Sequence, residues 1–197
     1  MWLGFSDESK ISKIQCQFMY PATDMLIKKY SSKKKFFVRE TPDMYFNITK
    51  PLLVDKIDPS SVDWLYNILE HKKEVEFRVC ETPEFILNKD WEFNEGALET
   101  MYCLAMPQDR SLKSVRDLNE THLPLLKSTR EESMKAIDEK FGLKKEEVVA
   151  FFHYPPTYYH LHIHFIHMKM LFDHSPTRTV FLDDVIENIE MYGGDYY

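Results

Sequence analysis

The sequence predicts an α+β fold built around an antiparallel sheet. Short segments rich in β-branched and aromatic residues, separated by turn residues, are typical of such strands. They fall at 76–80, 85–87, 102–106, 148–152 and 159–168. A long stretch between the third and fourth segments has apolar residues at helical spacing, so the chain combines a sheet with at least one substantial helix.

Three helices are expected from this spacing. Apolar residues at i, i+3, i+4 and i+7 predict the first helix at 62–69, with Ser60 or Ser61 as its N-terminal cap. The long helix covers about 119–141, and a short one follows at 184–191.

The composition indicates one globular domain. Of the 197 residues, 44% are hydrophobic and 29% are charged, which is ordinary for a protein with a buried core. The net charge of −7 disfavours long nucleic acid, because affinity for it comes from basic residues that displace counterions along many phosphates. A nucleotide-sized ligand in a local pocket remains compatible with this charge.

We expect a protein of the cytoplasm, and also of the nucleus, with no membrane partner. No segment approaches the ~20 apolar residues that cross a bilayer, and the N-terminus lacks the basic start and apolar core of an export signal. Cys16, Cys80 and Cys103 are far apart and odd in number, so they suggest neither a disulfide framework nor a zinc knuckle.

The segment from His153 to Phe165 carries the chemistry, because it holds four of the eight histidines. Residues two apart in a strand face the same side, so His160, His162 and His164 would form a row on one face of the sheet. Such a row suits a metal site, a nucleophilic imidazole oriented by its neighbours, or a purely structural set of histidines. Periodicity alone leaves all three readings open.

The alternating histidines resemble the signature of the histidine-triad (HIT) superfamily, and the preceding His153-Tyr-Pro-Pro-Thr-Tyr-Tyr is similar to its scavenger mRNA-decapping branch. The resemblance runs from Tyr20 to about residue 190. Further matching strings lie at 20–23, 39–41, 47–49, 64–69, 114–118 and 122–126.

The resemblance implies a HIT-like antiparallel sheet packed with helices, paired into a homodimer. It also implies that His162 attacks the phosphate attached to 7-methylguanosine, while His160, His164 and His153 supply hydrogen bonds. A neutral imidazole is a good nucleophile near pH 7, and no metal or cofactor is needed.

The resemblance assigns the cap base to Trp64 and Glu74. The methylated purine is cationic, so an indole face attracts it and a carboxylate accepts its N–H groups. Apart from the resemblance, Trp64 would be read as a core residue.

Five further residues are expected at the substrate. The resemblance assigns Thr157 and Tyr158 to phosphate contacts and Lys29 to the triphosphate. The alternatives are a turn threonine, a sheet tyrosine and a solvated lysine. Asn88 and Lys89 precede the second tryptophan, where this chain departs from the family pattern. We expect Asn88 at the guanine edge, and Lys89 in the role of the family's lysine from one position away.

The expected function is hydrolysis of the triphosphate bridge of 7-methylguanosine cap dinucleotide or short capped RNA, releasing 7-methylguanosine monophosphate. Three alternatives stay open: a HIT hydrolase of other dinucleoside polyphosphates, a cap-binding module that does not cut, and a zinc site. Residues 36–197 would form the HIT catalytic domain. Residues 1–35 would be an N-terminal arm or a remnant of the family's N-terminal domain, in a natural short form or a fragment.

Overall fold

The chain consists of two compact units, Met1–Pro42 and Asp43–Tyr197. The computed structural model describes residues 20–24, 27, 31, 36, 38–91, 93–173 and 178–197. The sheet and the candidate site both lie in the second unit.

Six strands form one sheet in which every neighbouring pair is antiparallel. Their spatial order is β1-β2-β3-β5-β4-β6. The strands are β1 (Arg78–Glu81), β2 (Phe85–Lys89), β3 (Tyr102–Pro107), β4 (Val148–His153), β5 (Ile163–His167) and β6 (Thr179–Phe181). The predicted α+β fold with an antiparallel sheet is confirmed.

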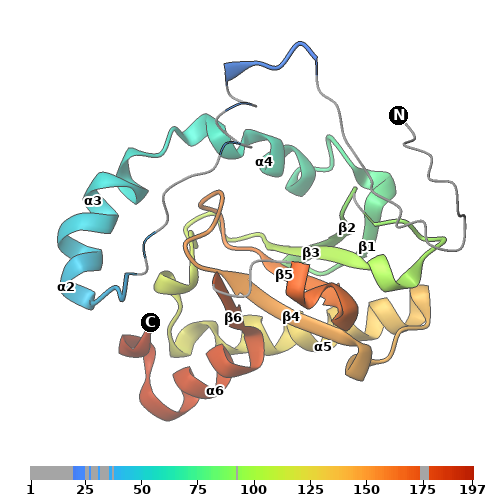
Figure 1. The fold of residues 1–197 in the computed structure, drawn as a ribbon. Helices are drawn as coiled ribbons and strands as arrows, with labels where there is room; N and C mark the ends of the chain where they lie inside the picture. The colour runs from blue at the N-terminus through green and yellow to red at the C-terminus, as the bar shows by residue number, and fades with distance from the viewer. Residues whose placement is uncertain are drawn as a thin grey trace, which may run out of the picture. The chain divides into compact units, whose positions relative to one another are not determined.

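The long and the last predicted helices are also confirmed. The helices are α2 (Pro42–Met44), α3 (Lys50–Leu52), α4 (Asp63–Leu69), α5 (Leu123–Phe141) and α6 (Leu182–Tyr192) (Figure 1). Pro124 fits the first turn of α5, where its missing N–H costs no hydrogen bond. Gly142 ends α5 with a φ of 75°, a left-handed conformation that glycine adopts without strain.

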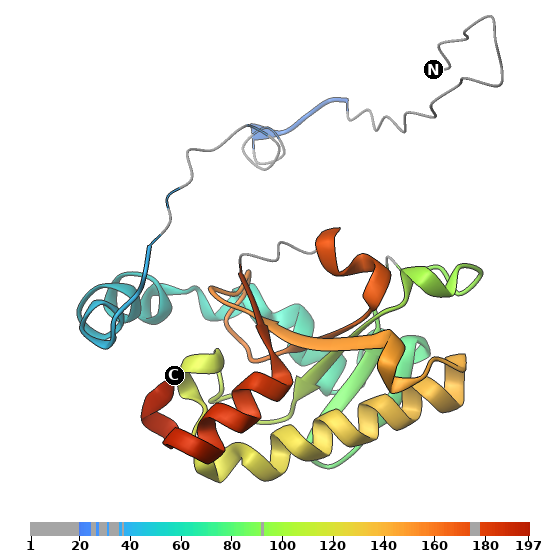
Figure 2. The ribbon, with the colours of Figure 1, turned by 60° about the horizontal axis from the view of Figure 1, so that its bottom comes forward.

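The helices cover the two faces of the sheet unequally. α5 and α6 lie along one face, whereas α4 lies against the other (Figure 1 and Figure 2). Alternation along β2 serves both faces: Phe85 and Leu87 pack into the core beneath α5 and α6, and Ile86 packs with Leu65 and Ile68 of α4. Because α4 is short, part of this second face is left for the site.

The strand predicted at 159–168 is shorter in the structure, where β5 begins only at Ile163. The backbone N–H of Leu161 donates to the carbonyl of Leu112 at 2.9 Å instead of joining a neighbouring strand. The chain therefore enters the sheet late, and His160 lies outside the strand that was expected to carry it.

The predicted cap of the first helix is wrong. A 3₁₀ turn over Pro59–Val62 precedes α4, and the carboxylate of Asp58 accepts a hydrogen bond from the backbone N–H of Ser60 at 3.0 Å. Asp58 thus provides the capping oxygen, since a carboxylate is as good an acceptor at this position as a serine hydroxyl.

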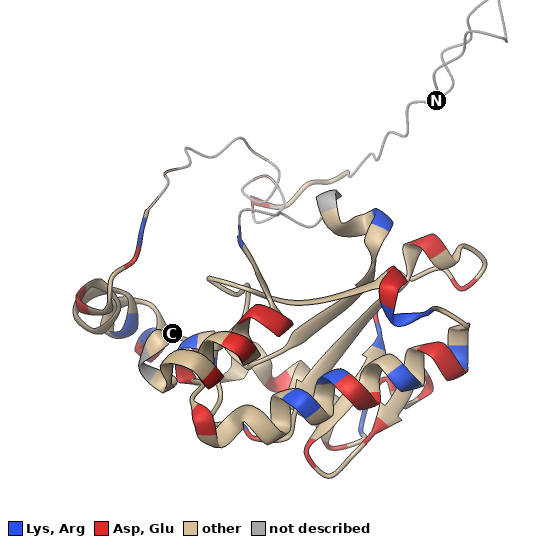
Figure 3. Ribbon diagram, turned by 90° about the horizontal axis from the view of Figure 1, so that it is seen from below, with Lys and Arg blue, Asp and Glu red and all other residues tan. Residues whose placement is uncertain are grey.

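Charges of both signs mark the outer helical layer. Figure 3 shows Lys or Arg and Asp or Glu interspersed along α5, as is typical of a helix with one solvated side. α6 carries Asp183 and Asp184 in its first turn, where negative charge stabilises the helix dipole. Within the residues described, no helix has both the length and the apolarity to cross a membrane.

Candidate active site

A cavity of about 470 Å³ opens on the α4 side of the sheet, and most of the predicted site residues surround it. They come from α4, from the turn after it, from β2, from β4 and β5, and from the segment that joins β4 to β5. The predicted residues that border the cavity are Trp64, Glu74, Asn88, Lys89, His153, Thr157, Tyr158, His162 and His164. Lys29 lies outside the described residues, and His160 does not border the cavity.

His162 is held in one tautomer by the backbone. Its Nδ1 lies 2.7 Å from the carbonyl oxygen of His160, and because a carbonyl only accepts, Nδ1 must carry the hydrogen. In the neutral ring Nε2 then keeps its lone pair. Burial lowers the pKa of His162 to about 4, so this neutral, nucleophilic form is present at neutral pH.

His164 lies on β5, two residues after His162, and is paired in register with Leu104 of β3 and Phe151 of β4. The ring centroids of His162 and His164 are 5.0 Å apart, and that of His153 is 4.5 Å from His164. His153 of β4, His164 of β5 and His162, which directly precedes β5, therefore share one wall of the cavity. A hydroxyl on β3 reaches this wall as well, since the oxygen of Tyr102 is 2.8 Å from Nδ1 of His164.

His160 differs from the other histidines of this segment, because its side chain makes its contacts away from the cavity. Its Nε2 lies 2.9 Å from the carbonyl oxygen of Pro107, and its ring contacts Tyr66 edge to face at 5.7 Å. Burial lowers the pKa of His160 to about 4, so the side chain is neutral inside the protein. What His160 gives to the site is its backbone carbonyl, which orients His162.

Tyr158 connects the histidines to the tryptophan. Its ring stacks on His162 with centroids 4.1 Å apart, and it meets Trp64 edge to face at 5.0 Å. Burial raises the pKa of Tyr158, so its phenol keeps its proton and can donate a hydrogen bond. The rings of Trp64, Tyr158, His162, His164 and His153 thus follow one another along the cavity.

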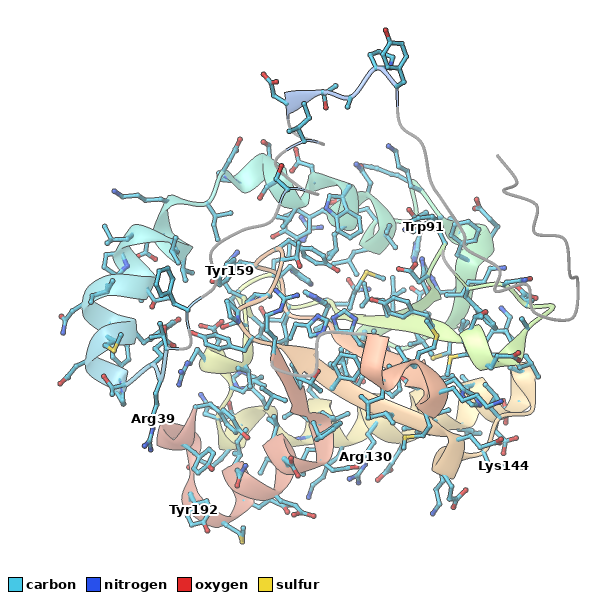
Figure 4. All side chains as sticks on the ribbon, in the orientation of Figure 1. Arg39, Trp91, Arg130, Lys144, Tyr159 and Tyr192 are labelled. Atoms are coloured by element: carbon cyan, nitrogen blue, oxygen red, sulfur yellow. The ribbon has the colours of Figure 1, made fainter. Side chains whose placement is uncertain are left out.

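Trp64 stands at one end of this line, and a second tryptophan, Trp91, also borders the cavity. Trp64 is 40% exposed although it lies on a helix whose next residue, Leu65, is fully buried. Trp91 follows β2, is 78% exposed, and lies on the α4 side of the sheet (Figure 4). Exposed indole faces that border a cavity are suited to stacking on a planar ligand.

The turn after α4 carries Glu74 to the same cavity that both tryptophans border. Its backbone has a φ of 55°, and its carbonyl accepts a hydrogen bond from Nδ2 of Asn88 at 3.3 Å. Oδ1 of Asn88 in turn accepts from Nε of Arg78 at 2.8 Å. Burial raises the pKa of Glu74, and the charges of Asp90 and Glu76 raise it further.

Lys89 borders the cavity, but its ammonium group is engaged elsewhere. Alternation along β2 places Asn88 on the site face and Lys89 on the α5 face. The Nζ atom of Lys89 pairs with the carboxylate of Glu95 and lies 5.4 Å from the centre of the Phe77 ring.

Comparison with known proteins agrees with this arrangement. Residues 63–177, more than half of the chain, match the family described as "Scavenger mRNA decapping enzyme C-term binding". The chain belongs to this scavenger decapping family. Within the described residues, this family member shows no group of three or more His, Cys, Asp or Glu residues that could hold a metal ion.

Three relatives of the family share the name m7GpppX diphosphatase. The Caenorhabditis elegans protein is 40% identical over 93% of this chain and 60% of its own length. The Schizosaccharomyces pombe protein is 34% identical over 94% of this chain and 63% of its own, and the Homo sapiens protein 35% over 92% and 55%. The chain thus spans 55% to 63% of the length of these three relatives, which is less than two thirds.

Four polar or aromatic residues that border the cavity of this scavenger-family site were not among the predicted site residues: Asp90, Trp91, Tyr102 and Arg178. Asp90 could have been found, because it is two residues beyond Asn88 and so shares its face. Tyr102 could not, since only the pairing of β3 with β5 brings it to His164. Arg178, whose Nη1 donates to the carbonyl of Pro155 at 3.4 Å, lies outside every string that carried the resemblance.

Proposed function

We propose that this chain hydrolyses the triphosphate bridge of 7-methylguanosine cap dinucleotide or short capped RNA fragments, with His162 as the nucleophile. The names of the relatives support the reaction, since each is an m7GpppX diphosphatase. The cavity supports the substrate class, because it combines stacking faces and a carboxylate with a wall of imidazoles.

The observation that carries the proposal is the state of His162. Its Nδ1–H is fixed on the carbonyl of His160, its pKa is about 4, and it borders the cavity. A ring held this way has a lone pair on Nε2 at neutral pH, and reorganisation before attack is small. His160, fully buried behind it, keeps that carbonyl in place.

The reaction follows in two balanced steps. Nε2 of His162 forms a bond to the phosphorus attached to 7-methylguanosine, and the bond from that phosphorus to the bridging oxygen breaks. The bridging oxygen leaves with the diphosphate-ended product. Water then attacks the phosphorus, the P–N bond breaks, and 7-methylguanosine monophosphate is released. The proton that the attacking water loses passes to solvent.

The groups around His162 suit the developing charge. His153, His164 and Arg178 border the same cavity, and Thr157 and Tyr158 add hydroxyl donors. Donors fixed in place before reaction stabilise the equatorial phosphate oxygens without reorganisation. At the other end, Trp64 and Glu74 supply the stacking face and the acceptor for the N–H groups of the cationic base.

Cleavage of cap dinucleotide by wild type and by His162→Asn tests the proposal. We expect a loss of at least several hundredfold, on the order of the ~4 kcal/mol that a catalytic nucleophile contributes. His71→Asn is the matched control, because His71 is exposed and pairs with Glu81 away from the cavity.

Three other results would redirect the assignment. Equal turnover of methylated and unmethylated cap dinucleotide would indicate a hydrolase of other dinucleoside polyphosphates. Tight binding without turnover would indicate a cap-binding module. Metal found in protein purified without added metal, with activity lost on its removal, would point to a zinc site.

Two further parts of the proposal are supported by the family resemblance alone. We propose that the chain forms a homodimer, which sedimentation equilibrium would test at micromolar protein concentration. We also propose that it acts in the cytoplasm and the nucleus, which fractionation of cells expressing the tagged full chain would test.

A further inference from the structure

Tyr102 reaches the histidine wall of the cavity from a neighbouring strand. It pairs in register with Ile166, and Leu104, two residues further along β3, pairs with His164. Tyr102 and His164 are therefore diagonal neighbours on one face of the sheet, and an aromatic side chain is long enough to bridge that separation. The Tyr102 oxygen lies 2.8 Å from Nδ1 of His164, and both residues border the cavity.

Packing fixes the plane of the His164 ring but does not choose between its two orientations in that plane. Phe151, a fully buried residue of β4, stacks on the imidazole with centroids 5.1 Å apart and planes 13° from parallel. A stacked imidazole can turn over by roughly 180° and keep such a contact, because the terminal torsion of histidine is broadly two-fold. The turned ring would place Cδ2 at the Tyr102 hydroxyl, and the hydrogen bond would be lost. Tyr102 therefore selects one orientation.

The two neighbouring imidazoles of the wall are held by partners of different kinds. Nδ1 of His162 meets a backbone carbonyl, which only accepts, so the neutral ring has one tautomer. Nδ1 of His164 meets a phenol hydroxyl, which both donates and accepts. The hydroxyl donates to Nδ1 when that atom carries no hydrogen and accepts from it when it does. The bond to Tyr102 thus holds His164 in place whether the ring is neutral or protonated.

We infer that Tyr102 is a positioning residue for cleavage, which holds His164 in one ring orientation and so decides which ring atoms face the transferred phosphate. The inference rests on the proposed function and deepens it, because that function makes His164 a donor to the phosphate oxygens. Tyr102 needs no contact with the substrate for this role. A polyphosphate brings negative charge, which favours the protonated imidazole, and the bond to the hydroxyl persists in that form.

A purely structural role for the hydroxyl would have different consequences. The ring of Tyr102 packs against both hydrophobic clusters of the sheet, and phenylalanine keeps that ring. Tyr102→Phe removes the contact that distinguishes the two orientations of His164 and leaves the stacking on Phe151 in place. The loss of activity should therefore depend on the presence of His164, whereas a loss of fold would not.

A double-mutant cycle tests this dependence, with cleavage of cap dinucleotide measured for wild type, Tyr102→Phe, His164→Asn and the double variant. We expect Tyr102→Phe to lower kcat roughly threefold to thirtyfold and to change KM by less than about twofold. On the His164→Asn background the same change should alter kcat by less than about twofold, because the residue through which Tyr102 acts is gone. Urea unfolding of the same samples measures stability.

Tyr66→Phe is the matched control for the loss of a tyrosine hydroxyl. Tyr66 is partly buried in one of the clusters that Tyr102 joins, but it does not border the cavity. Phenylalanine also keeps the edge-to-face contact that the Tyr66 ring makes with His160. Tyr66→Phe should therefore retain the wild-type kcat. Ring-nitrogen NMR of the full chain gives a readout without substrate, in which the Nδ1 resonance of His164 should move in Tyr102→Phe but not in Tyr66→Phe.

The outcomes separate this inference from the proposed function. If wild type cleaves cap dinucleotide and Tyr102→Phe cleaves it at the same rate, the inference is wrong and the function stands. Equal losses from Tyr102→Phe with and without His164 would also overturn the inference, since they would assign the hydroxyl to substrate contact or to support of the fold. An unchanged Nδ1 resonance of His164 in Tyr102→Phe would overturn it as well. If wild type does not cleave the cap dinucleotide, both fail.

Discussion

Replacing Trp64 with alanine should separate recognition from stability. Trp64 and Leu65 are neighbours on α4, yet Trp64 is 40% exposed and Leu65 is fully buried. The ring contact that Trp64 makes is an edge-to-face pair with Tyr158, and such pairs contribute about 0.5–1.5 kcal/mol. The buried part of the ring adds to this contribution, so we expect Trp64→Ala to lower the free energy of unfolding by about 1–2 kcal/mol.

Binding should respond more strongly than stability. An aromatic side chain that stacks on one base contributes about 1–3 kcal/mol, so the affinity for 7-methylguanosine monophosphate should fall by about 5- to 150-fold. The loss should be visible in KM more than in kcat, because Trp64 is separated from His162 by the ring of Tyr158.

Isothermal titration and urea unfolding of the same protein samples measure both effects. Leu65→Ala is the matched control: removing a fully buried leucine typically costs 2–5 kcal/mol of stability, while the stacking face remains. If Trp64→Ala loses as much stability as Leu65→Ala, or binds the nucleotide as wild type does, Trp64 is a packing residue and the base site must be sought elsewhere.

Three other substitutions or conditions test the site. The pKa of His162 is about 4, so protonation of His162 should not lower kcat/KM near pH 6, and kcat/KM should fall as the pH drops through about 4. The free energy of unfolding should also decline as the pH falls from 6.5, the ordinary pKa of histidine, to about 4, because the unfolded chain binds the proton more tightly. The pKa of Glu74 is raised, so its ionised form is disfavoured by folding, and Glu74→Gln should leave stability at neutral pH unchanged or higher while cap affinity drops and turnover of an adenine-containing polyphosphate barely changes. Asn88→Leu should cost about 1–3 kcal/mol in urea unfolding, since it leaves Nε of Arg78 without its acceptor, and should raise KM more than it lowers kcat.

Local patterns predicted α4, α5, α6 and most strands, because the signals for these elements are contained in the sequence segment itself. The segment of the long helix has apolar residues at helical spacing and a glycine after them, and α5 ends at that glycine as predicted. β6 is only three residues long, too short for alternation to be recognised, and exists because it pairs with β4. α2 and α3 are likewise three residues each and carry no periodic signal.

The site could be predicted only in part. Strand alternation predicts which face a side chain is on, but it does not predict where along the chain the strand begins. A regular strand at 159–168 would give His160, His162 and His164 equivalent positions. The hydrogen bond from Leu161 to Leu112 removes His160 from that strand and leaves its carbonyl facing His162. For β2 the alternation alone predicts that adjacent side chains point to opposite faces, so Asn88 faces the site while the ammonium of Lys89 pairs with Glu95.

The contacts of Tyr158 link base binding to phosphate chemistry. Its ring lies between Trp64 and His162, so a base stacked on Trp64 and a phosphate at His162 meet the same side chain from two directions. The burial that keeps His162 neutral also means that an incoming polyphosphate must lose water before it reaches Nε2. Contacts at the tryptophan end can offset that cost only for a ligand that spans the cavity. A nucleotide with a cationic base and a polyphosphate tail meets this requirement at both ends, whereas inorganic phosphate or a free base meets it at one.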